Sequence, residues 1–463
     1  MIFKLSRWAR MLMLALALTL GFAPPAAAQD EDEDGARTTV LRDSEAELLF
    51  RDISRPLIRA AGLNPASVDV VLVNDPEINA FVSSGQRVYI HSGLILATKD
   101  VNELQGVIAH ELGHVAGGHS IRLQGGMSQA SGLTIATLLL GALAMAAGAG
   151  EAGTAIMMAG QRAAMGNLLA FSRTQESTAD QAGAKYLAAS GISGKGMLDF
   201  FGKLQNQEYR LAVYAKDSYD RTHPLSNERI AALTETFKND AAWGRGPDAT
   251  LDARFHRVRA KLQGFVNPKQ ATVKYPESDQ SVPAHYARAY AYHVGGYPEK
   301  ALSEADALLA RDPADPFFLE LKGQILLESG RPTEAIAPLR QATDVSGDSP
   351  LIASMLGHAL IATDEARYFP EAKQVLKAAV GRDNENPFAW YQLGIIYDRE
   401  GDRPRAALAT AERNNLEGKP KLALRYAETA MKGISASSPD YLRAQDIAMV
   451  SRAELKKKDK NKR

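Results

Sequence analysis

The sequence predicts a mainly α-helical chain of the α+β class, with a small β-sheet in its first half and an α-solenoid in its second half. Apolar residues recur at helical spacing over 44–61, and valine-rich alternating segments lie within 67–95. A repeat period of 34 residues begins near residue 283. The 463 residues exceed the usual domain length of about 100–200, so we expect at least two domains.

The N-terminus has the pattern of a secretory signal peptide. Three basic residues precede the apolar run 11–22, and small residues lead to a predicted cleavage site after Ala28. An uncleaved membrane anchor needs about 20 apolar residues, so this run is short for one. We expect residues 1–28 to be removed on export to the periplasm, and residues 29–43 to form a disordered acidic leader.

The composition excludes several kinds of partner and site. Lys and Arg balance Asp and Glu at 54 each, so the charge gives no reason to expect a nucleic-acid partner. The chain has no cysteine, and therefore neither a disulfide nor a lipid-bearing cysteine. A zinc site in this chain must use histidine and carboxylate ligands.

The elements of the first half follow from periodicity. Residues 44–61 predict a helix that ends at Gly62, and 67–73 predict a strand. Residues 78–95 read as two short strands around a Ser-Ser-Gly turn, and 101–119 as a helix. An extended substrate would then pair with the strand at 85–91 through main-chain hydrogen bonds.

Residues 131–149 are apolar or small throughout. This segment is either a membrane-inserting hairpin or a buried or interfacial helix pair, and its Gly and Ala content favours the helix pair. The fully apolar part barely reaches the length that spans a bilayer. We therefore expect at most peripheral membrane contact through 131–149.

The second half contains a helical repeat. Pro298 and Pro332 lie 34 residues apart, as do Gly323 and Gly357, and WYQLGIIY at 390–397 has the W-x-x-L-G-x-x-Y pattern of a tetratricopeptide repeat. Each repeat is a helix-turn-helix unit that buries its apolar face against its neighbours. The sequence therefore predicts a concave helical surface, which serves either as a binding platform or as a plain scaffold.

The sequence HELGH contains two candidate zinc ligands. His110 and His114 are four residues apart, so on a helix both imidazoles project from one face and can reach one ion. Glu111 lies between them in the sequence. His119 is a candidate for the third ligand, but the H-E-x-x-H-x-x-G-x-x-H pattern places its third histidine at position 120, where this sequence has Ser120. We therefore interpret His119 as a residue that supports a ligand or as a plain surface residue.

A second helix supplies the better third ligand. Glu176 and Asp180, in FSRTQESTADQAGAKYL, are four residues apart and share a helix face. One carboxylate can bind the metal while the other orients a ligand histidine. The sequence thus predicts a zinc ion held by His110, His114 and Glu176, with the fourth position left to water.

HELGH, followed about 60 residues later by ESTAD, resembles the gluzincin metallopeptidases of the HtpX and CAAX-prenyl-protease group. The signal peptide and the C-terminal tetratricopeptide repeats make the chain similar to the periplasmic branch of that family. NAFV at 79–82 and GQRVYIHSGLI at 85–95 also resemble the family's strand beside the active-site cleft. Family members of the HtpX type carry spanning helices, and here only 131–149 is a candidate.

The resemblance implies a role for each site residue. His110, His114 and Glu176 would be the ligands of one Zn²⁺ per chain, and Glu111 the catalytic base. In RTHPLSNER at 221–229, His223 falls where the family places a histidine near the metal. His223 would either polarise the substrate or fill the open zinc position and restrain the enzyme.

These features predict an exported zinc endopeptidase that acts in envelope and outer-membrane protein quality control. Its expected partners are misfolded or unassembled envelope proteins, together with outer-membrane assembly machinery bound by the repeats. One alternative is a non-proteolytic chaperone or adaptor with a structural zinc; another is a membrane-embedded peptidase anchored by 131–149. The predicted divisions are a signal peptide at 1–28, a leader at 29–43, a peptidase domain at 44–265, a linker at 266–283, repeats at 284–455 and a basic tail at 456–463.

Overall fold

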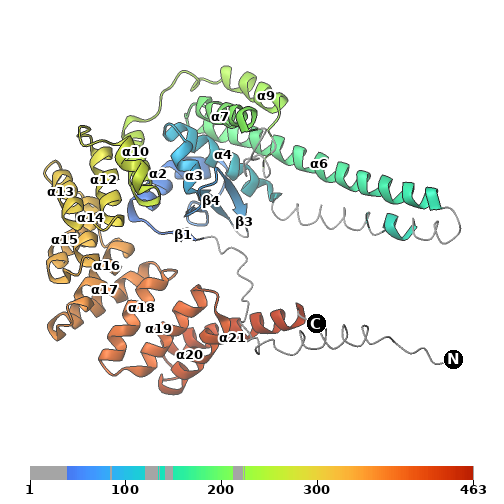
Figure 1. Cartoon of the computed structure of the whole chain (residues 1–463). Helices are drawn as coiled ribbons and strands as arrows, with labels where there is room; N and C mark the ends of the chain where they lie inside the picture. Colours follow the sequence, from blue (N-terminus) through green and yellow to red (C-terminus); the bar gives the residue numbers. More distant parts are fainter. Residues whose placement is uncertain are drawn as a thin grey trace, which may run out of the picture. The chain divides into compact units, whose positions relative to one another are not determined.

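The structure is a computed structural model that describes residues 39–83, 86–119, 134, 136–140, 150–211, 223 and 225–461. It confirms the predicted fold class, a mainly helical chain with one small sheet and a C-terminal α-solenoid (Figure 1). The first half contains β1 (Val40–Leu41), α2 (Ser44–Ala60), β2 (Asp69–Val73), β3 (Ala80–Ser83), β4 (Arg87–His91), α3 (Ser92–Ala97), α4 (Val101–Gly117), α6 (Gly150–Ala189), α7 (Lys195–Leu211), α9 (Asn227–Lys238), α10 (Ala249–Val266) and α11 (Pro268–Lys274).

The second half is a series of helix pairs. They are α12 (Val282–Val294) and α13 (Pro298–Leu309), α14 (Pro316–Glu328) and α15 (Pro332–Val345), α16 (Pro350–Ala362) and α17 (Phe369–Arg382), α18 (Pro387–Arg399) and α19 (Arg403–Leu416), and α20 (Pro420–Gly433) and α21 (Pro439–Asn461). The 34-residue spacing of Pro298 and Pro332 reflects their place at the start of the second helix of a pair. The next interval, from Gly357 to Gly394, is longer than 34 residues and includes the 3₁₀ helix η1 (Ala366–Tyr368).

Glycine makes the repeat helices pack closely. A Cβ added at Gly323 in α14 would lie 2.4 Å from Leu339 of α15, and one at Gly357 in α16 would lie 2.5 Å from Leu376 of α17. Gly323 and Gly357 therefore mark points where the two helices of their pairs pack closely.

The four strands form one mixed sheet in the order β1-β2-β4-β3. β2 and β4 are parallel, and β1 and β3 are antiparallel to their neighbours. The expectation that the strand at 85–91 pairs with a substrate is wrong, because β4 lies inside the sheet with both edges hydrogen-bonded. Within the described chain, β3 is the edge strand beside it. The middle of the predicted Ser-Ser-Gly turn lies outside the described residues.

Helix α4 lies at the centre of the first half. Asp100 caps its start by accepting a hydrogen bond from the Glu103 amide at 3.1 Å, and Gly118 ends it in the left-handed region at φ 62°. All residues from Val101 to His114 are buried, because α2, α6, α7 and the sheet surround the helix. Helix α4 is therefore part of the core, and its polar side chains, including His110, Glu111 and His114, are buried with it.

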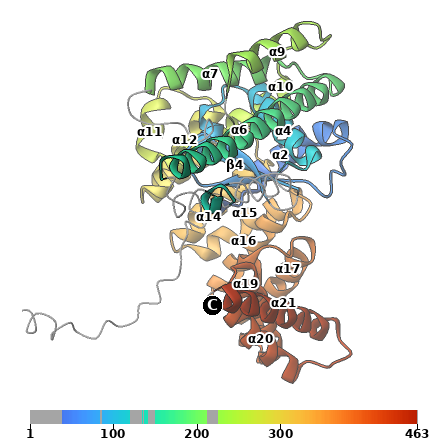
Figure 2. The same cartoon turned by 90° about the vertical axis from the view of Figure 1, so that its right-hand side faces the viewer.

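Helices α4 and α6 lie side by side in both views (Figures 1 and 2). A Cβ at Gly113 would lie 2.6 Å from the Ala179 carbonyl oxygen, and one at Gly183 would lie 3.0 Å from the Ala109 carbonyl oxygen. The glycine in HELGH therefore lets the two backbones approach. This contact brings the ESTAD segment of α6 opposite the two histidines of α4.

Several sequence predictions concern residues at the limits of the described chain. The signal peptide and residues 29–38 of the leader lie outside it, as does most of 131–149. The expectation that the leader is disordered as far as residue 43 is wrong, because Val40 and Leu41 form β1 and pair with β2. Leu138, Leu139 and Leu140 are 48, 62 and 57% exposed, so this part of the segment is not buried as a core helix would be. In the described residues, no helix has both the length and the apolar content to cross a membrane.

The segment 266–283, expected as a linker, contains α11, and its residue Ala271 is fully buried. The predicted basic tail continues α21 as helix to Asn461, with exposed side chains at 456–459. The predicted domain boundaries at 44–265 and 284–455 remain predictions.

Candidate metal centre

Helix α4 presents the two predicted ligand histidines from one face. His110 is fully buried and His114 is 8% exposed. Their Nε2 atoms are 3.1 Å apart, as the four-residue spacing on a helix predicts. Glu111 is also fully buried on the same helix.

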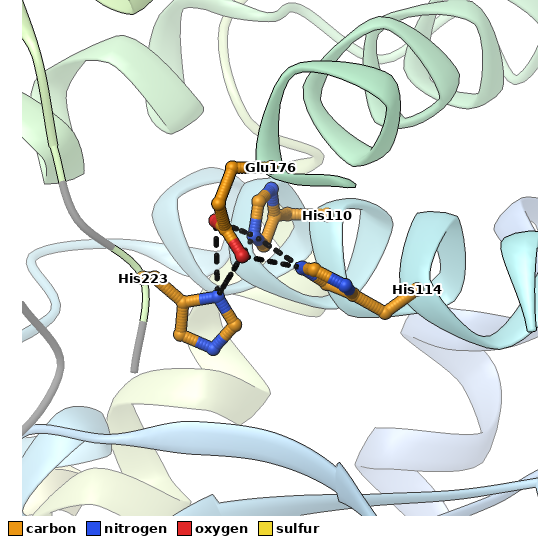
Figure 3. Close-up of side chains that lie close together, drawn as sticks. All are labelled: His110, His114, Glu176 and His223. Atoms are coloured by element: carbon orange, nitrogen blue, oxygen red, sulfur yellow. Dashed lines mark hydrogen bonds and ion pairs between the residues drawn. The ribbon is translucent and has the colours of Figure 1, made fainter. Parts of the chain in front are cut away.

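Glu176 of α6 completes a group of three donors. Its Oε2 lies 3.4 Å from His110 Nε2, and its Oε1 lies 3.3 Å from His114 Nε2 (Figure 3). Glu176 is 4% exposed. The structure thus brings together the three residues that the sequence predicted as zinc ligands.

His223 joins the same cluster, and its ring points toward the other three side chains (Figure 3). Its Nδ1 is 3.2 Å from both carboxylate oxygens of Glu176 and 3.3 Å from His110 Nε2. Ligand atoms of all four residues lie within 4.8 Å of one another. On its other side, His223 Nε2 is 3.2 Å from the Ala80 carbonyl oxygen of β3.

Asp180 and Arg229 contact the predicted ligand side chains His110 and Glu176. His110 Nδ1 is 2.9 Å from Asp180 Oδ1, the contact that the sequence predicted for a carboxylate orienting a ligand histidine. Arg229 of α9 donates to both oxygens of Asp180 at 2.7 and 2.9 Å, and it lies 3.2 Å from Glu176. Sequence reasoning missed Arg229, although it is the last residue of the RTHPLSNER segment that was singled out for His223.

His119 is buried and supports a ligand. Its Nδ1 lies 2.9 Å from His114 Nδ1, and its Nε2 lies 3.4 Å from Thr178 Oγ1 on α6. Of the two interpretations from the sequence, the geometry favours the residue that orients His114 over the plain surface residue.

The electrostatics of the centre favour a cation. Burial opposes protonation of His110, but hydrogen bonds to Asp180 and Glu176 raise its pKa to about 10. Burial also disfavours the charged form of Glu176, yet hydrogen bonds from His110, His114 and His223 hold its pKa far below the usual range. Burial lowers the pKa of His114. The carboxylate therefore stays ionised and favours positive charge between these side chains.

The donor set fits zinc. Two imidazole nitrogens and one carboxylate are the ligands of many catalytic zinc sites, and no sulfur is needed. Both carboxylate oxygens of Glu111 are buried without a hydrogen-bond partner, and Oε1 lies 3.5 Å from His223 Nε2 of this cluster. A buried carboxylate without a partner is costly, so its presence here points to a polar group that it serves.

Comparisons with known proteins agree with this geometry. Residues 45–237 match the sequence model of peptidase family M48. The beta-barrel assembly-enhancing protease of Escherichia coli K12 is 26% identical over 380 residues, which are 79% of this chain and 75% of that protein. Metalloprotease LoiP of the same organism is 29% identical over 216 residues, which are 45% of this chain and 78% of that protein.

Among solved structures, YrrB, described as a TPR protein with an unusual peptide-binding site, aligns with a TM-score of 0.31 and 20% identity. The alignment covers 38% of this chain and 92% of that chain. The repeat fold itself rests on the helix pairs described above. The zinc-type donor cluster lies inside residues 45–237, the part of the chain that matches peptidase family M48, so the chain is a metalloendopeptidase that carries C-terminal tetratricopeptide repeats.

Proposed function

We propose that this chain is an exported zinc endopeptidase in which His110, His114 and Glu176 hold the metal and Glu111 is the catalytic base. One observation carries the proposal: Glu111 is buried beside a converging set of two imidazoles and a carboxylate, with no hydrogen bond to either of its oxygens and with Oε1 3.5 Å from His223 Nε2. A purely structural zinc site has no use for a base at that position.

Each residue has a defined task in peptide hydrolysis. Zinc held here supplies a Lewis acid and lowers the pKa of a water molecule to about 7. Glu111 takes the proton of the attacking water and returns it to the leaving amine, a role typically worth about 10² to 10⁴ in rate. Asp180 keeps His110 in the tautomer whose Nε2 is free to bind, and Arg229 holds Asp180 ionised.

The substrate binds along β3 in this proposal. Asn79 accepts a hydrogen bond from His91 of β4, so the backbone groups of the next residue, Ala80, point to the outer edge of the sheet. A peptide that adds a strand there would form main-chain hydrogen bonds without a sequence requirement. His223, which is 3.2 Å from the Ala80 carbonyl oxygen, occupies this edge and must move before the peptide can bind.

The biological role follows from the relatives and stays a proposal. The curated relatives include beta-barrel assembly-enhancing proteases, which supports a role in outer-membrane protein quality control in the periplasm. The repeats would recruit misfolded or unassembled envelope proteins and the assembly machinery. The exposed Leu138–Leu140 support peripheral contact of 131–149 with the membrane surface.

Glu111→Gln tests the catalytic assignment. The amide cannot accept a proton, so we expect the variant to keep its fold and zinc while cleavage of an unfolded β-barrel protein falls by at least about 10². Zinc is counted by elemental analysis, and cleavage is followed by gel electrophoresis. Glu176→Ala is the contrasting variant, because it should lose most of the zinc together with activity. Unchanged cleavage by Glu111→Gln would refute the mechanism, and full zinc in Glu176→Ala would refute the third ligand.

A chaperone or adaptor remains the second candidate function. His223 Nδ1 lies where a fourth ligand would complete a closed site, which is the arrangement of a structural zinc. In that case, wild type and Glu111→Gln would suppress aggregation of the same client equally, and neither would cleave it.

A further inference from the structure

A second cluster of metal-ligand side chains lies outside the catalytic centre. Asp75 and Glu77 are in the loop between β2 and β3, and His91 is the last residue of β4. One ligand atom from each of the three lies within 4.8 Å of the other two. The cluster shares no residue with the catalytic centre.

The backbone of this loop is held in place independently of any ion. The Asp75 carbonyl oxygen accepts hydrogen bonds from Ser92 Oγ at 2.7 Å and from the Gly93 amide at 2.9 Å. The Asp75 amide donates back to Ser92 Oγ at 3.2 Å. Gly93 is required for this contact, because a Cβ there would lie 2.1 Å from the Pro76 carbonyl oxygen. The backbone at Asp75 is therefore fixed close to the end of β4.

His91 is the observation that points to a ligand. It is only 6% exposed, and its Nδ1 is buried without a hydrogen-bond partner. The nitrogen faces Asp75, whose Oδ1 is 3.5 Å away, too far for a good hydrogen bond. A buried polar atom without a partner costs about 1–3 kcal/mol, so it calls for a group that satisfies it.

We propose that Asp75, Glu77 and His91 bind a second zinc ion. One imidazole nitrogen and two carboxylates suit Zn²⁺, whereas Ca²⁺ and Mg²⁺ prefer oxygen ligands alone. The Asp75 side chain is 36% exposed and Glu77 is exposed, so water can complete the coordination and the ion can exchange with solvent. This site therefore binds zinc more weakly than the buried catalytic centre. It raises the expected content from one zinc per chain to two.

The position of the site gives it a consequence for the enzyme. The loop from Asp75 leads directly into β3, whose first residue, Ala80, faces His223. Zinc bound by Asp75, Glu77 and His91 would fix the start of the strand that receives the peptide. This consequence rests on the proposed function, whereas the binding of zinc does not.

Counting zinc on the full chain tests the site. Wild type, His91→Ala, Asp75→Asn and the control Asp69→Asn are dialysed against Zn²⁺ buffered from nanomolar to micromolar free concentration, and bound zinc is measured by elemental analysis. Asp69 is an exposed carboxylate on β2 outside the cluster. We expect two ions in wild type and in Asp69→Asn, and one in His91→Ala and in Asp75→Asn. Asp75→Asn alters a partly exposed side chain, so it keeps the test valid if His91→Ala fails to fold.

Two results would overturn the proposal. One is a single zinc in wild type at every concentration; the other is two zinc ions in Asp75→Asn. Anomalous diffraction at the zinc edge from crystals grown with Zn²⁺ gives the position: a peak among the three side chains supports the site, and a water without anomalous signal there refutes it. Glu111→Gln should still bind two ions, so failure of the peptidase assignment and failure of this site are distinguishable.

Discussion

His223 differs from the other histidines of the centre because its two ring nitrogens contact different parts of the active site. Nδ1 faces the metal donors, and Nε2 faces the Ala80 carbonyl oxygen at the sheet edge. One side chain thus covers both the open coordination position and the place where a peptide strand would bind. Neutral imidazole is a good zinc ligand, so we propose that His223 restrains the enzyme in this arrangement.

His223→Ala should therefore raise basal proteolysis, including self-cleavage, without loss of zinc. A preference of about 1.4 kcal/mol for the closed state would make the increase about tenfold. The measurement is the initial cleavage rate of equal amounts of zinc-loaded protein, with His256→Ala, on the partly exposed face of α10, as the control histidine. If His223 instead stabilises the transition state, the rate falls, and such a fall would rule out restraint as its main role.

The sequence predicted most of the centre at the residue scale. The spacing of His110 and His114 requires only that α4 be helical, and Glu176 with Asp180 requires only a second helix. Arg229 was not predictable in the same way, because its bond to Asp180 joins residues 49 apart in sequence. Nothing in the spacing of RTHPLSNER indicates that Arg229 and His223 both approach Glu176.

At the scale of elements, the centre depends on the crossing of α4 and α6. The crossing is close because Gly113 and Gly183 remove side chains from the contact. A wider separation would draw Glu176 away from His110 and His114, since the carboxylate and the histidines belong to different helices. Metal affinity is therefore coupled to helix packing.

Gly113→Ala should weaken both stability and zinc binding. The added Cβ would lie 2.6 Å from the Ala179 carbonyl oxygen. Backbone atoms cannot move aside as the tip of a flexible side chain can, so we expect the free energy of unfolding to fall by about 1–3 kcal/mol. Gly202→Ala in α7 is the matched control, because its Cβ meets nothing within 4 Å and alanine favours the helix. The test compares the Tm and the zinc content of the two variants. Equal Tm and equal zinc content in Gly113→Ala and Gly202→Ala would contradict the coupling of metal affinity to helix packing.

The order of the strands could not be predicted. The alternating pattern locates β2, β3 and β4 in the sequence, but it does not say which strand lies at the edge. Because β4 pairs in parallel with β2 and antiparallel with β3, the strand that seemed suited to a substrate is an interior one. Pairing between strands distant in the sequence determines which strand lies at the edge, and the local pattern of residues carries no information on that pairing.

At the scale of the whole molecule, a buried network of charged and polar groups joins α2 to the repeats. Tyr286 of α12 donates to Glu45 at 2.7 Å, Arg257 of α10 contacts Glu45 at 2.8 Å, and Ser44 donates to Glu320 of α14 at 3.3 Å. Lys261 pairs with Asp43, and also lies 3.7 Å from Glu45. These partners are far apart in sequence, so no periodicity could have indicated the junction.

Glu320 makes this junction sensitive to pH. Burial raises its pKa to about 8, with Lys261 opposing the rise and Asp43 adding to it, while an unfolded chain would have an ordinary value near 4.5. Between these two values the folded protein keeps a proton that the unfolded chain releases. The contribution of Glu320 to the free energy of unfolding is therefore most favourable below about pH 4.5 and is lost as the pH rises through about 8.

Glu320→Gln should remove this pH dependence, because the amide resembles the protonated acid at every pH. We expect Tm of the variant and wild type to be similar near pH 5, and the variant to be the more stable of the two near pH 9. Glu454→Gln, at an exposed position on α21, is the control and should follow wild type at both pH values. Parallel Tm profiles for Glu320→Gln and wild type across this range would show that the carboxyl is ionised in the folded protein. The neutral form is favoured here because Glu320 Oε2 is buried without a hydrogen-bond partner, where a negative charge would be costly.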